Sequence, residues 1–491
     1  MQTGFLYATY QAVEPYLPFA LSGMALAAAT ITSIHVILSR REPGSSIAWI
    51  ALVWLAPLVG VIAYLILGIN RIKRRAEHLR DPEDPYLTTP DVEPVTQDQL
   101  RARLPEESRH LLQLLPLVDR VVERPLLPGN RLTPLFDGDQ AYPAMIEAID
   151  NAEHSVNLAS YIFDNDEAGH RFVKALEAAD KRGVEVRVLI DAAGLRYSFP
   201  SIYTRLRRAN IEVARFLPSI FPPHIMTINL RNHRKIMVVD GKIGFTGGIN
   251  IRSHHVLEDE PDFPARDIHF KMEGPVVAHL QEVFTADWAF STDEQLRGPA
   301  YFPELSRVGE AMARGIPDGP DEDLDRLRWT LKGAISSAEK SIRIMTPYFI
   351  PDGPMVSSLA VAALRGVQVD IILPEVSNLP YVHWASMAHL RPLLNRGCRI
   401  FYTPAPFDHS KLMVVDGVWM LCGSANIDPR SLRLNFEFNV ECWDPELAGQ
   451  LDRYLDSRIE DARQLTLEDY DNRSRLIQVR DGLASLLSPY L

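Results

Sequence analysis

At residues 233–240 the chain reads HRKIMVVD, and at residues 409–416 it reads HSKLMVVD. In both stretches one residue separates His from Lys, an apolar run follows, and the Asp is succeeded by Gly. Asp-Gly between two β-branched apolar runs is a strong signal for a tight hairpin. The His and Lys of each copy therefore lie on the same side of an extended segment. An eight-residue pattern that occurs twice argues against the ordinary structural explanation of a lone histidine.

The two stretches belong to a longer internal repeat. AEHSV at residues 152–156 matches AEKSI at 338–342, and RGVEVRVLI at 182–190 matches RGVQVDIIL at 365–373. The segments follow the same order in both copies, which predicts two equivalent structural units. Within each unit, helical periodicity alternates with short β-branched runs. This alternation indicates an α/β fold made of two repeated α/β sandwich halves, each with a largely buried sheet.

The bulk composition excludes some classes of protein. The 491 residues carry a formal net charge of −12, which disfavours a general nucleic-acid binder. The three cysteines, Cys398, Cys422 and Cys442, match the spacing of no zinc module, and their sparse use suits a reducing compartment.

Two apolar runs, residues 17–38 and 47–69, contain no Asp, Glu, Lys or Arg. Each is long enough to cross a bilayer as a helix, and the polar turn at 39–46 connects them. We therefore predict a transmembrane hairpin over residues 1–75. A cleaved signal peptide is the alternative for the first run, but no Lys or Arg precedes that run and a second span follows it.

The remaining boundaries follow from composition and from the repeat. Residues 76–135 are rich in Pro, Glu and Arg and are predicted to be a connector with one short helix near 111–122. The first half is predicted over residues 136–320, and the second over 321–491 with a C-terminal helix. That last segment fits either an amphipathic helix on the bilayer or a helix packed against the second half.

Orientation follows from the basic residues that flank the spans. The second span is followed by four of them, whereas the turn contains Arg40 and Arg41. The four are Arg71, Lys73, Arg74 and Arg75. Because the larger cluster stays inside, we expect a multi-pass protein of the cell membrane with its catalytic part in the cytoplasm.

The duplicated stretches predict a phosphate-directed active site. Each is followed by a small-residue turn that ends in Asn: GGIN at 247–250 and GSAN at 423–426. Such turns and two lysines would hold the oxygens of a phosphodiester. The candidate phosphate-binding residues are Lys235, Asn250, Lys411, Ser424 and Asn426. The candidate catalytic residues are His233, Lys235, Asp240, His409, Lys411 and Asp416.

Two histidines permit a division of labour in which one attacks phosphorus and the other transfers the proton. Asp240 and Asp416 are also preferred turn residues, so we interpret them as supporting the site rather than reacting. Lysine is not a normal metal ligand, so a metal site fits poorly. No cofactor is required, because one phosphodiester is exchanged for another of similar energy.

The paired His-x-Lys-x4-Asp motifs resemble those of the phospholipase D superfamily, and their surroundings resemble bacterial cardiolipin synthases. Further similarity lies along nearly the whole chain, in REP at residues 41–43, YIF at 161–163, MEGP at 272–275, TPYF at 346–349 and NIDPRSL at 426–432. The tail LASLLSP at residues 483–489 resembles the family's ending as well.

This resemblance implies that His233 becomes a covalent phosphatidyl-histidine and that His409 is the general acid and base. It also implies an acidic partner about thirty residues after each histidine, at Asp267 and Glu437. We expect each carboxylate to orient a catalytic imidazole, that of the opposite half, and to favour its charged form. Gly248 departs from the pattern, because many relatives carry Ser there, as this chain does at Ser424.

The expected reaction joins two phosphatidylglycerol molecules to give cardiolipin and glycerol, and the expected partners are therefore membrane phospholipids rather than nucleic acid. A phospholipase D that hydrolyses, or one that uses another acceptor alcohol, is the nearest alternative. A superfamily nuclease and a non-catalytic membrane scaffold are more distant ones. The sequence does not distinguish a synthase from a hydrolase, because they differ in how well water is excluded.

Overall fold

The structure is a computed structural model that describes residues 14–39, 43–68, 92–217, 230–320 and 323–488. The chain divides into two compact units, of which the first holds the N-terminal 72 residues and the second holds both copies of the repeat. Each unit is described by itself.

The N-terminal unit begins with a short turn of helix, η1 (Glu14–Tyr16), and the long helix α2 (Leu17–Leu38). This stretch is the one described helix that is long and apolar enough to cross a membrane. Its apolar side chains are largely exposed, as Phe19 and Ile31 illustrate at 78% and 67%. An uncovered apolar surface of this kind is typical of a membrane-facing helix.

The expectation of one continuous second span over residues 47–69 is wrong. The structure divides the described part of this run into α3 (Pro43–Leu55), α4 (Pro57–Ala63) and a π-helical turn, η2 (Tyr64–Gly68). The break lies at Ala56, because Pro57 has no N–H to donate and its ring excludes the preceding residue from helical geometry. The hairpin as two full spans is therefore not observed.

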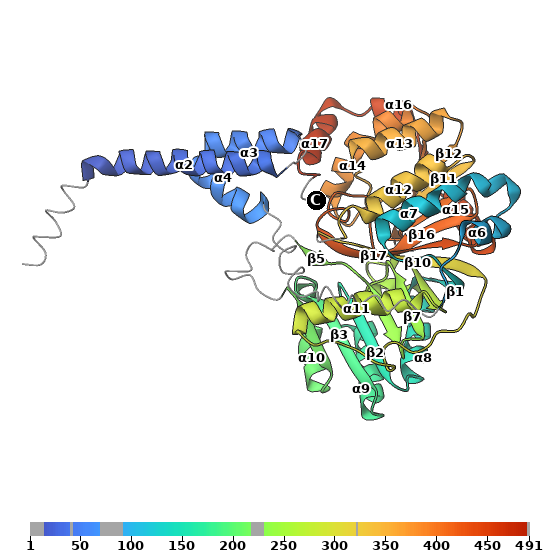
Figure 1. Ribbon diagram of the computed structural model, residues 1–491. Coiled ribbons are helices and arrows are strands. Elements are labelled where there is room, and N and C mark those ends of the chain that lie inside the picture. Colours follow the sequence, from blue (N-terminus) through green and yellow to red (C-terminus); the bar gives the residue numbers. More distant parts are fainter. Residues whose placement is uncertain (1–13, 40–42, 69–91, 218–229, 321–322, 489–491) are drawn as a thin grey trace, which may run out of the picture. The chain divides into compact units, whose positions relative to one another are not determined.

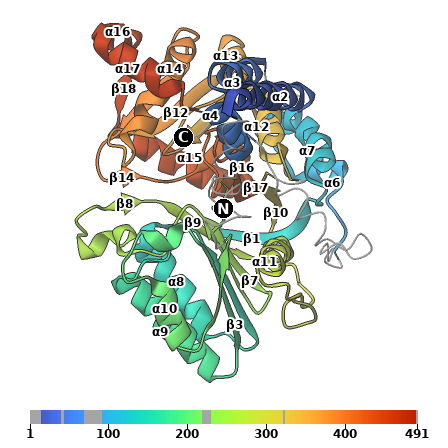
Figure 2. The ribbon, with the colours of Figure 1, turned by 90° about the vertical axis from the view of Figure 1, so that its left-hand side faces the viewer.

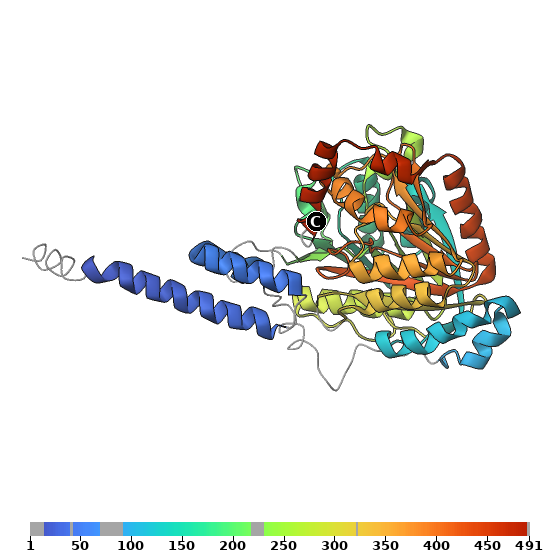
Figure 3. The same cartoon turned by 90° about the horizontal axis from the view of Figure 1, so that it is seen from above.

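Helix α3 nevertheless lies alongside α2 (Figures 1 and 3). Val36, Trp49 and Tyr64 form a small apolar cluster, and Trp54 Nε1 donates a hydrogen bond to Ser33 Oγ at 3.0 Å. His35 Nδ1 lies 2.6 Å from the Tyr64 hydroxyl. The basic residues after the second run, on which the orientation was predicted, lie outside the described residues, as do Arg40 and Arg41.

The second unit is built on one 16-stranded sheet in which the two copies of the repeat meet. Fifteen strands follow the order β18-β13-β12-β11-β15-β16-β17-β10-β1-β9-β7-β6-β2-β3-β4, and the sixteenth, β5, pairs with β17 off this path. Read outward from the central antiparallel pair β1–β10, the order of one copy mirrors that of the other. Figure 2 shows the two halves one above the other, joined along these central strands. The predicted duplicated α/β fold is confirmed.

The first half contains β1 (Leu127–Phe136), α8 (Asp137–Asp150), β2 (Ser155–Ser160), α9 (Glu167–Lys181), β3 (Glu185–Asp191), α10 (Ile202–Arg208), β4 (Glu212–Phe216), β5 (Arg231–Asn232), β6 (Ile236–Val239), β7 (Ile243–Gly247), β8 (Ala265–Arg266), β9 (Ile268–Glu273) and α11 (Val277–Thr292). Helices α8, α9 and α10 lie on one side of the strands and α11 on the other (Figure 2). Strands β2 and β6 are consequently buried along their whole length.

The second half contains β10 (Ala311–Asp318), α12 (Arg326–Ser337), β11 (Ser341–Met345), α13 (Gly353–Leu364), β12 (Gln368–Pro374), α14 (Pro380–Leu394), β13 (Arg399–Thr403), β14 (Phe407–Asp408), β15 (Leu412–Val415), β16 (Trp419–Gly423), β17 (Asn435–Trp443), α15 (Pro445–Glu460), β18 (Arg463–Leu465), α16 (Leu467–Asp471) and α17 (Arg475–Ser485). Helix α17 packs on α14 through Ala484, while Leu476 and Leu483 stay exposed. Packing against the second half is thus observed for the C-terminal helix.

The predicted domain boundaries are wrong by one strand in each half. Strand β1 falls in the predicted connector, although it pairs with β9 and β10. Strand β10 falls in the predicted first half, although it pairs with β17 of the second. Both strands contain Pro and Gly, which break a strand pattern in sequence but are accommodated here.

Before β1, the described part of the connector is mainly helical. It forms α6 (Gln97–Arg103), the 3₁₀ segment η3 (Glu106–Gln113) and α7 (Leu114–Val122). Helix α7 packs on α12, where Leu114 and Leu117 fill the space left by Gly333. The short helix predicted near 111–122 is present, and its buried face joins the core of the second half.

Candidate active site

The histidines of the two motifs are placed by two short parallel bridges between the halves. Strand β5 pairs with the start of β17, and the His233 N–H then donates to the Phe436 carbonyl at 2.9 Å. Strand β14 pairs with β8 in the same way, and the His409 N–H donates to the Arg266 carbonyl at 2.8 Å. Each motif histidine is therefore held against a segment of the opposite half.

The residue that follows each of these carbonyls is the predicted acidic partner. His233 Nδ1 lies 3.0 Å from Glu437 Oε2, and His409 Nδ1 lies 2.7 Å from Asp267 Oδ2. Both carboxylates are fully buried, whereas the two imidazoles retain a small exposed edge. The structure thus brings together the four residues that the sequence singled out, with each carboxylate paired to the histidine of the other half.

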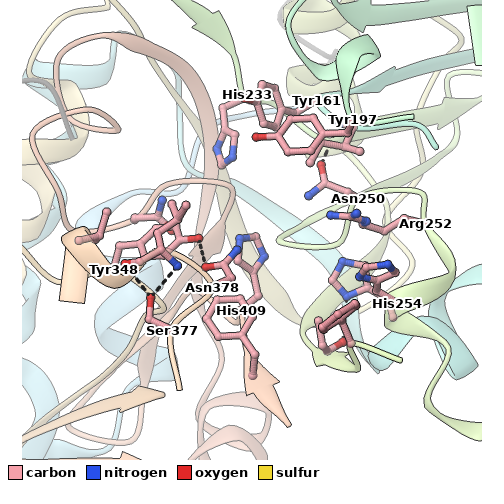
Figure 4. A pocket seen from close by; sticks show the side chains of 18 of the residues that line it. Tyr161, Tyr197, His233, Asn250, Arg252, His254, Tyr348, Ser377, Asn378 and His409 are labelled. Carbon is pink, nitrogen blue, oxygen red and sulfur yellow. Dashed lines mark hydrogen bonds between the residues drawn. The ribbon is translucent and has the colours of Figure 1, made fainter. Parts of the chain in front are cut away.

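Both imidazoles line one large cavity of about 1050 Å³. In Figure 4 their rings point into it, with Tyr161, Asn250 and Arg252 on the side of the first half and Tyr348 on the side of the second. The Tyr161 ring meets His233 edge-on with centroids 4.9 Å apart. A cavity of this size exceeds most small-molecule sites and has room for the headgroups of two lipids.

The motif lysines are buried beside the histidines. Lys235 Nζ donates to the His233 carbonyl at 2.7 Å, and Lys411 Nζ lies 3.1 Å from His409 Nε2. Burial lowers the pKa of Lys235 to about 7 and that of Lys411 to about 8, although Glu437 and Asp267 oppose the shift. Because a buried ammonium is costly, these lysines are prepared to gain from an anion that enters the cavity.

Electrostatics favour neutral imidazoles when the cavity is empty. Burial lowers the pKa of His233, and Glu437 only partly offsets it. Burial and the Lys411 charge hold the pKa of His409 well below its ordinary value. Glu437 thus favours the charged form of His233, as expected, but burial and the lysines outweigh this effect in the unliganded site.

The tautomer of His233 follows from its partner. Burial raises the pKa of Glu437, but His233, Lys235 and Ser424 outweigh that effect, so the carboxylate is ionised and can only accept. Nδ1 must then carry the proton that it donates to Glu437. The lone pair of Nε2 is left free.

Gly248 and Asp267 explain the departure of the first copy from the family pattern. In the second copy, the Ser424 hydroxyl donates to Glu437 Oε2 at 2.5 Å. In the first copy, a Cβ on Gly248 would lie 2.1 Å from Asp267 Oδ1. The shorter carboxylate has drawn into the space of the missing serine side chain, so Gly248 and Asp267 form a matched pair.

Asp240 and Asp416 have the supporting role expected of them, whereas the assignment of Ser424 changes. Asp240 accepts from the backbone N–H groups of residues 153–155, and Asp416 accepts from those of 339–341. Neither lines the cavity, so both fix the start of a neighbouring strand rather than react. Ser424 is fully buried and supports Glu437 instead of facing a phosphate.

Among the remaining phosphate-binding candidates, Lys235 and Lys411 are buried and do not line the cavity. Asn250 and Asn426 both line it. Asn250 Oδ1 accepts from the Ile162 N–H at 3.1 Å, which turns its amide nitrogen toward the cavity (Figure 4). Asn426 Nδ2 lies 3.3 Å from Ser431 Oγ.

Sequence reasoning missed Arg252 and His255, which also line the cavity, and His110, whose Nε2 lies 2.6 Å from Asp416 Oδ2. The sequence does hold a signal for Arg252. This residue stands two positions after Asn250, whereas Asp428 stands two positions after Asn426, so a comparison of the two copies shows a reversal of charge. Nothing in the sequence marks His110, since it belongs to the connector.

Comparisons with known proteins agree with this geometry. The family model "Cardiolipin synthase, PLD-like domain" matches residues 145–288 and 331–459, and the model "Phospholipase_D-nuclease N-terminal" matches residues 27–68. The chain belongs to the bacterial cardiolipin synthases of the phospholipase D superfamily. The N-terminal match and the apolar helix α2 together support a membrane-associated protein.

Curated members of this family match over nearly the full length. Cardiolipin synthase 2 of Staphylococcus epidermidis is 32% identical over 93% of this chain and 95% of its own. The major cardiolipin synthase of Bacillus subtilis (strain 168) is 31% identical over 93% of this chain and 96% of its own. The crystal structure of phosphatidylserine synthase from Haemophilus influenzae has a TM-score of 0.58 at 14% identity and covers 77% of this chain and 100% of its own, which shows a shared fold.

Replacing Glu437 with Gln tests its role as the partner of His233. The glutamine amide carries no negative charge to stabilise the His233 ring, and its N–H group favours the tautomer with the proton on Nε2. We therefore expect turnover to fall about a hundredfold or more. Steady-state assay of phosphatidyl transfer measures it, with the exposed Glu446→Gln as the matched control. Near-normal turnover of a folded Glu437→Gln enzyme would refute this role.

The buried lysines predict a pH-dependent affinity for phosphodiesters. Glycerophosphoglycerol keeps a constant single charge at neutral and alkaline pH, so changes in its binding report on the protein. The charged lysines are present below pH 7 and are lost as pH rises through about 7 and 8. We expect affinity, measured by calorimetry, to fall at least about tenfold between pH 6 and 9. An affinity for glycerophosphoglycerol that does not change with pH would contradict this prediction.

Proposed function

We propose that this protein joins two phosphatidylglycerol molecules into cardiolipin and releases glycerol, with a phosphatidyl group carried on His233. The observation that carries the proposal is the pair of imidazoles, each backed by a buried carboxylate of the opposite half and both facing one cavity. Membership of the cardiolipin synthase family supports it independently.

In the first step, Nε2 of His233 attacks the phosphorus of the donor lipid. The bond from phosphorus to the glycerol oxygen breaks, and His409 supplies the proton to that oxygen. His409 is neutral in the empty cavity, but the negative charge of a bound diester favours its protonated form. Lys235 and Lys411 neutralise the charge that gathers on the phosphoryl oxygens.

In the second step, a hydroxyl of the acceptor lipid enters the place that the glycerol has left. His409 takes the hydroxyl proton, the new oxygen–phosphorus bond forms, and the phosphorus–nitrogen bond to His233 breaks. Glu437 stabilises the positive charge that the His233 ring carries while the phosphatidyl group is attached. One diester replaces another, so the sequence of steps balances without a nucleotide.

We further propose that the N-terminal unit crosses the membrane more than once, with the catalytic halves in the cytoplasm. The interrupted second apolar run and α2 fit a membrane-embedded helix pair, because polar side chains of one contact polar side chains of the other. Trp54 donates to Ser33, and His35 contacts Tyr64. Polar side chains within membranes are generally satisfied in this way.

A lipid turnover assay tests the reaction. Full-length protein in liposomes of labelled phosphatidylglycerol should yield cardiolipin and free glycerol, and His233→Ala should abolish both because the phosphatidyl carrier is gone. Lys174→Gln, on the exposed face of α9, serves as the control. Phosphatidic acid as the main product would instead assign a hydrolase. Transfer to phosphatidylethanolamine in a parallel sample would assign a different acceptor.

Labelling of introduced cysteines tests the topology. We expect Asp98→Cys, in the described part of the connector, to be protected from an impermeant thiol reagent in intact cells. Ser45→Cys, exposed in the first turn of α3, should be labelled. The three native cysteines are buried and give little background. The reverse pattern would refute the proposed orientation.

A further inference from the structure

Arg252 is a cation in the cavity wall to which the two-step reaction above assigns no role. It stands two residues after Asn250, and in Figure 4 its guanidinium lies in the wall of the first half beside Asn250 and His254. Its Nε lies 3.0 Å from Oδ2 of the buried Asp164. The ion pair engages one edge of the planar guanidinium and leaves its other donors for a ligand.

The backbone at Arg252 is held by a buried tyrosine. The hydroxyl of Tyr142, itself fully buried, accepts from the Arg252 N–H at 3.0 Å and lies 2.6 Å from the Asn250 carbonyl. Together with Asp164, this contact holds the arginine in place before any ligand arrives. A preorganised guanidinium recognises phosphate with little loss of conformational freedom.

The second half has the opposite charge at the equivalent position. Asn250 and Asn426 are matched by the repeat, and two residues beyond them stand Arg252 and Asp428. Asp428 is buried, lines the cavity, and its Oδ1 accepts from the Ser431 N–H at 2.6 Å. A site that is symmetric in its histidines and lysines is thus asymmetric in charge at its periphery.

Arg252 lies on the side of the cavity that holds the proton-transferring histidine. The ring of His255, three residues further on, is 6.4 Å from that of His409. After burial, the two lysines and His233, the Arg252 charge is the next cause that lowers the pKa of His409. The group that His409 protonates or deprotonates therefore extends toward Arg252.

The chemistry of the two steps decides what Arg252 meets. The leaving glycerol and the incoming headgroup present an oxygen to His409 at the same place. The far end of the leaving glycerol carries only a hydroxyl, whereas the far end of the accepting headgroup carries a phosphate. A cation beyond the glycerol position distinguishes these two molecules.

We propose that Arg252 is the centre of a second phosphate subsite, which binds the phosphodiester of the acceptor lipid and orients its free hydroxyl toward His409. This inference rests on the proposed synthase function and adds the basis of acceptor choice. Asp428 disfavours the same phosphate at the matched place in the other half. The subsite favours phosphatidylglycerol over glycerol and water as acceptor, so the phosphatidyl group on His233 passes to phosphatidylglycerol more often than to glycerol or water.

The test compares a charged acceptor with an uncharged one in a single sample. Full-length enzyme in phosphatidylglycerol liposomes is supplied with labelled glycerol. Cardiolipin reports transfer to the phosphate-bearing acceptor, and labelled phosphatidylglycerol reports transfer to glycerol. We expect Arg252→Gln to lower cardiolipin formation about ten- to a hundredfold with little change in glycerol exchange. Arg252→Lys should restore part of the ratio, because it keeps the charge without the planar fork.

Three results would overturn the subsite. An unchanged product ratio in Arg252→Gln shows that the acceptor phosphate does not bind there. Equal loss of both products in Arg252→Gln and Arg252→Lys shows a structural or donor-step role. Wild-type enzyme that exchanges glycerol but forms no cardiolipin refutes the synthase function itself, and the subsite with it. Lys174→Gln should behave as wild type throughout.

Discussion

The active site depends on the two short parallel bridges by which each half holds the other. Strand β5 lies against β17, and β14 lies against β8. In each bridge a histidine backbone N–H bonds to the carbonyl that precedes an acidic residue, so the imidazole and the carboxylate meet without further adjustment. Each of the two histidine–carboxylate pairs takes one member from each half. The duplicated fold must be assembled before any chemistry is possible.

Duplication supplies the reacting groups, and divergence between the copies gives them separate tasks. Glu437 with Ser424 supports His233, while the shorter Asp267, with no side chain at Gly248, supports His409. The hydroxyl of Ser424 helps to keep Glu437 ionised, whereas burial raises the pKa of Asp267 to about 6. The partner of His233, the proposed nucleophile, is thus the more firmly charged carboxylate, which suits the positive charge that this ring carries in the proposed intermediate.

The sequence predicted what depends on local pattern and duplication. The hairpins predicted at the two Asp-Gly pairs form as β6–β7 and β15–β16, and His233 and Lys235 lie just before β6. Features set by tertiary packing were not accessible. Pro and Gly in β1 and β10 concealed central strands, and Pro57 divided an apolar run whose composition indicated one helix. Asp240 and Asp416 share the motif with the histidines, yet their carboxylates bind backbone amides at the opposite end of the strand.

The ionisable groups of this site favour binding of an anionic ligand, because in the empty protein their charged forms are disfavoured. Two lysines are buried with lowered pKa values, and two imidazoles are kept neutral beside them. A single anionic diester in the cavity favours the charged form of the lysines and of His409 at once, since each was disfavoured mainly by burial and by the other cations. In the proposed mechanism, binding therefore creates the proton donor of the first step. A neutral molecule of similar shape would leave His409 without its proton, so the same electrostatics that bind phosphate also restrict the chemistry to it.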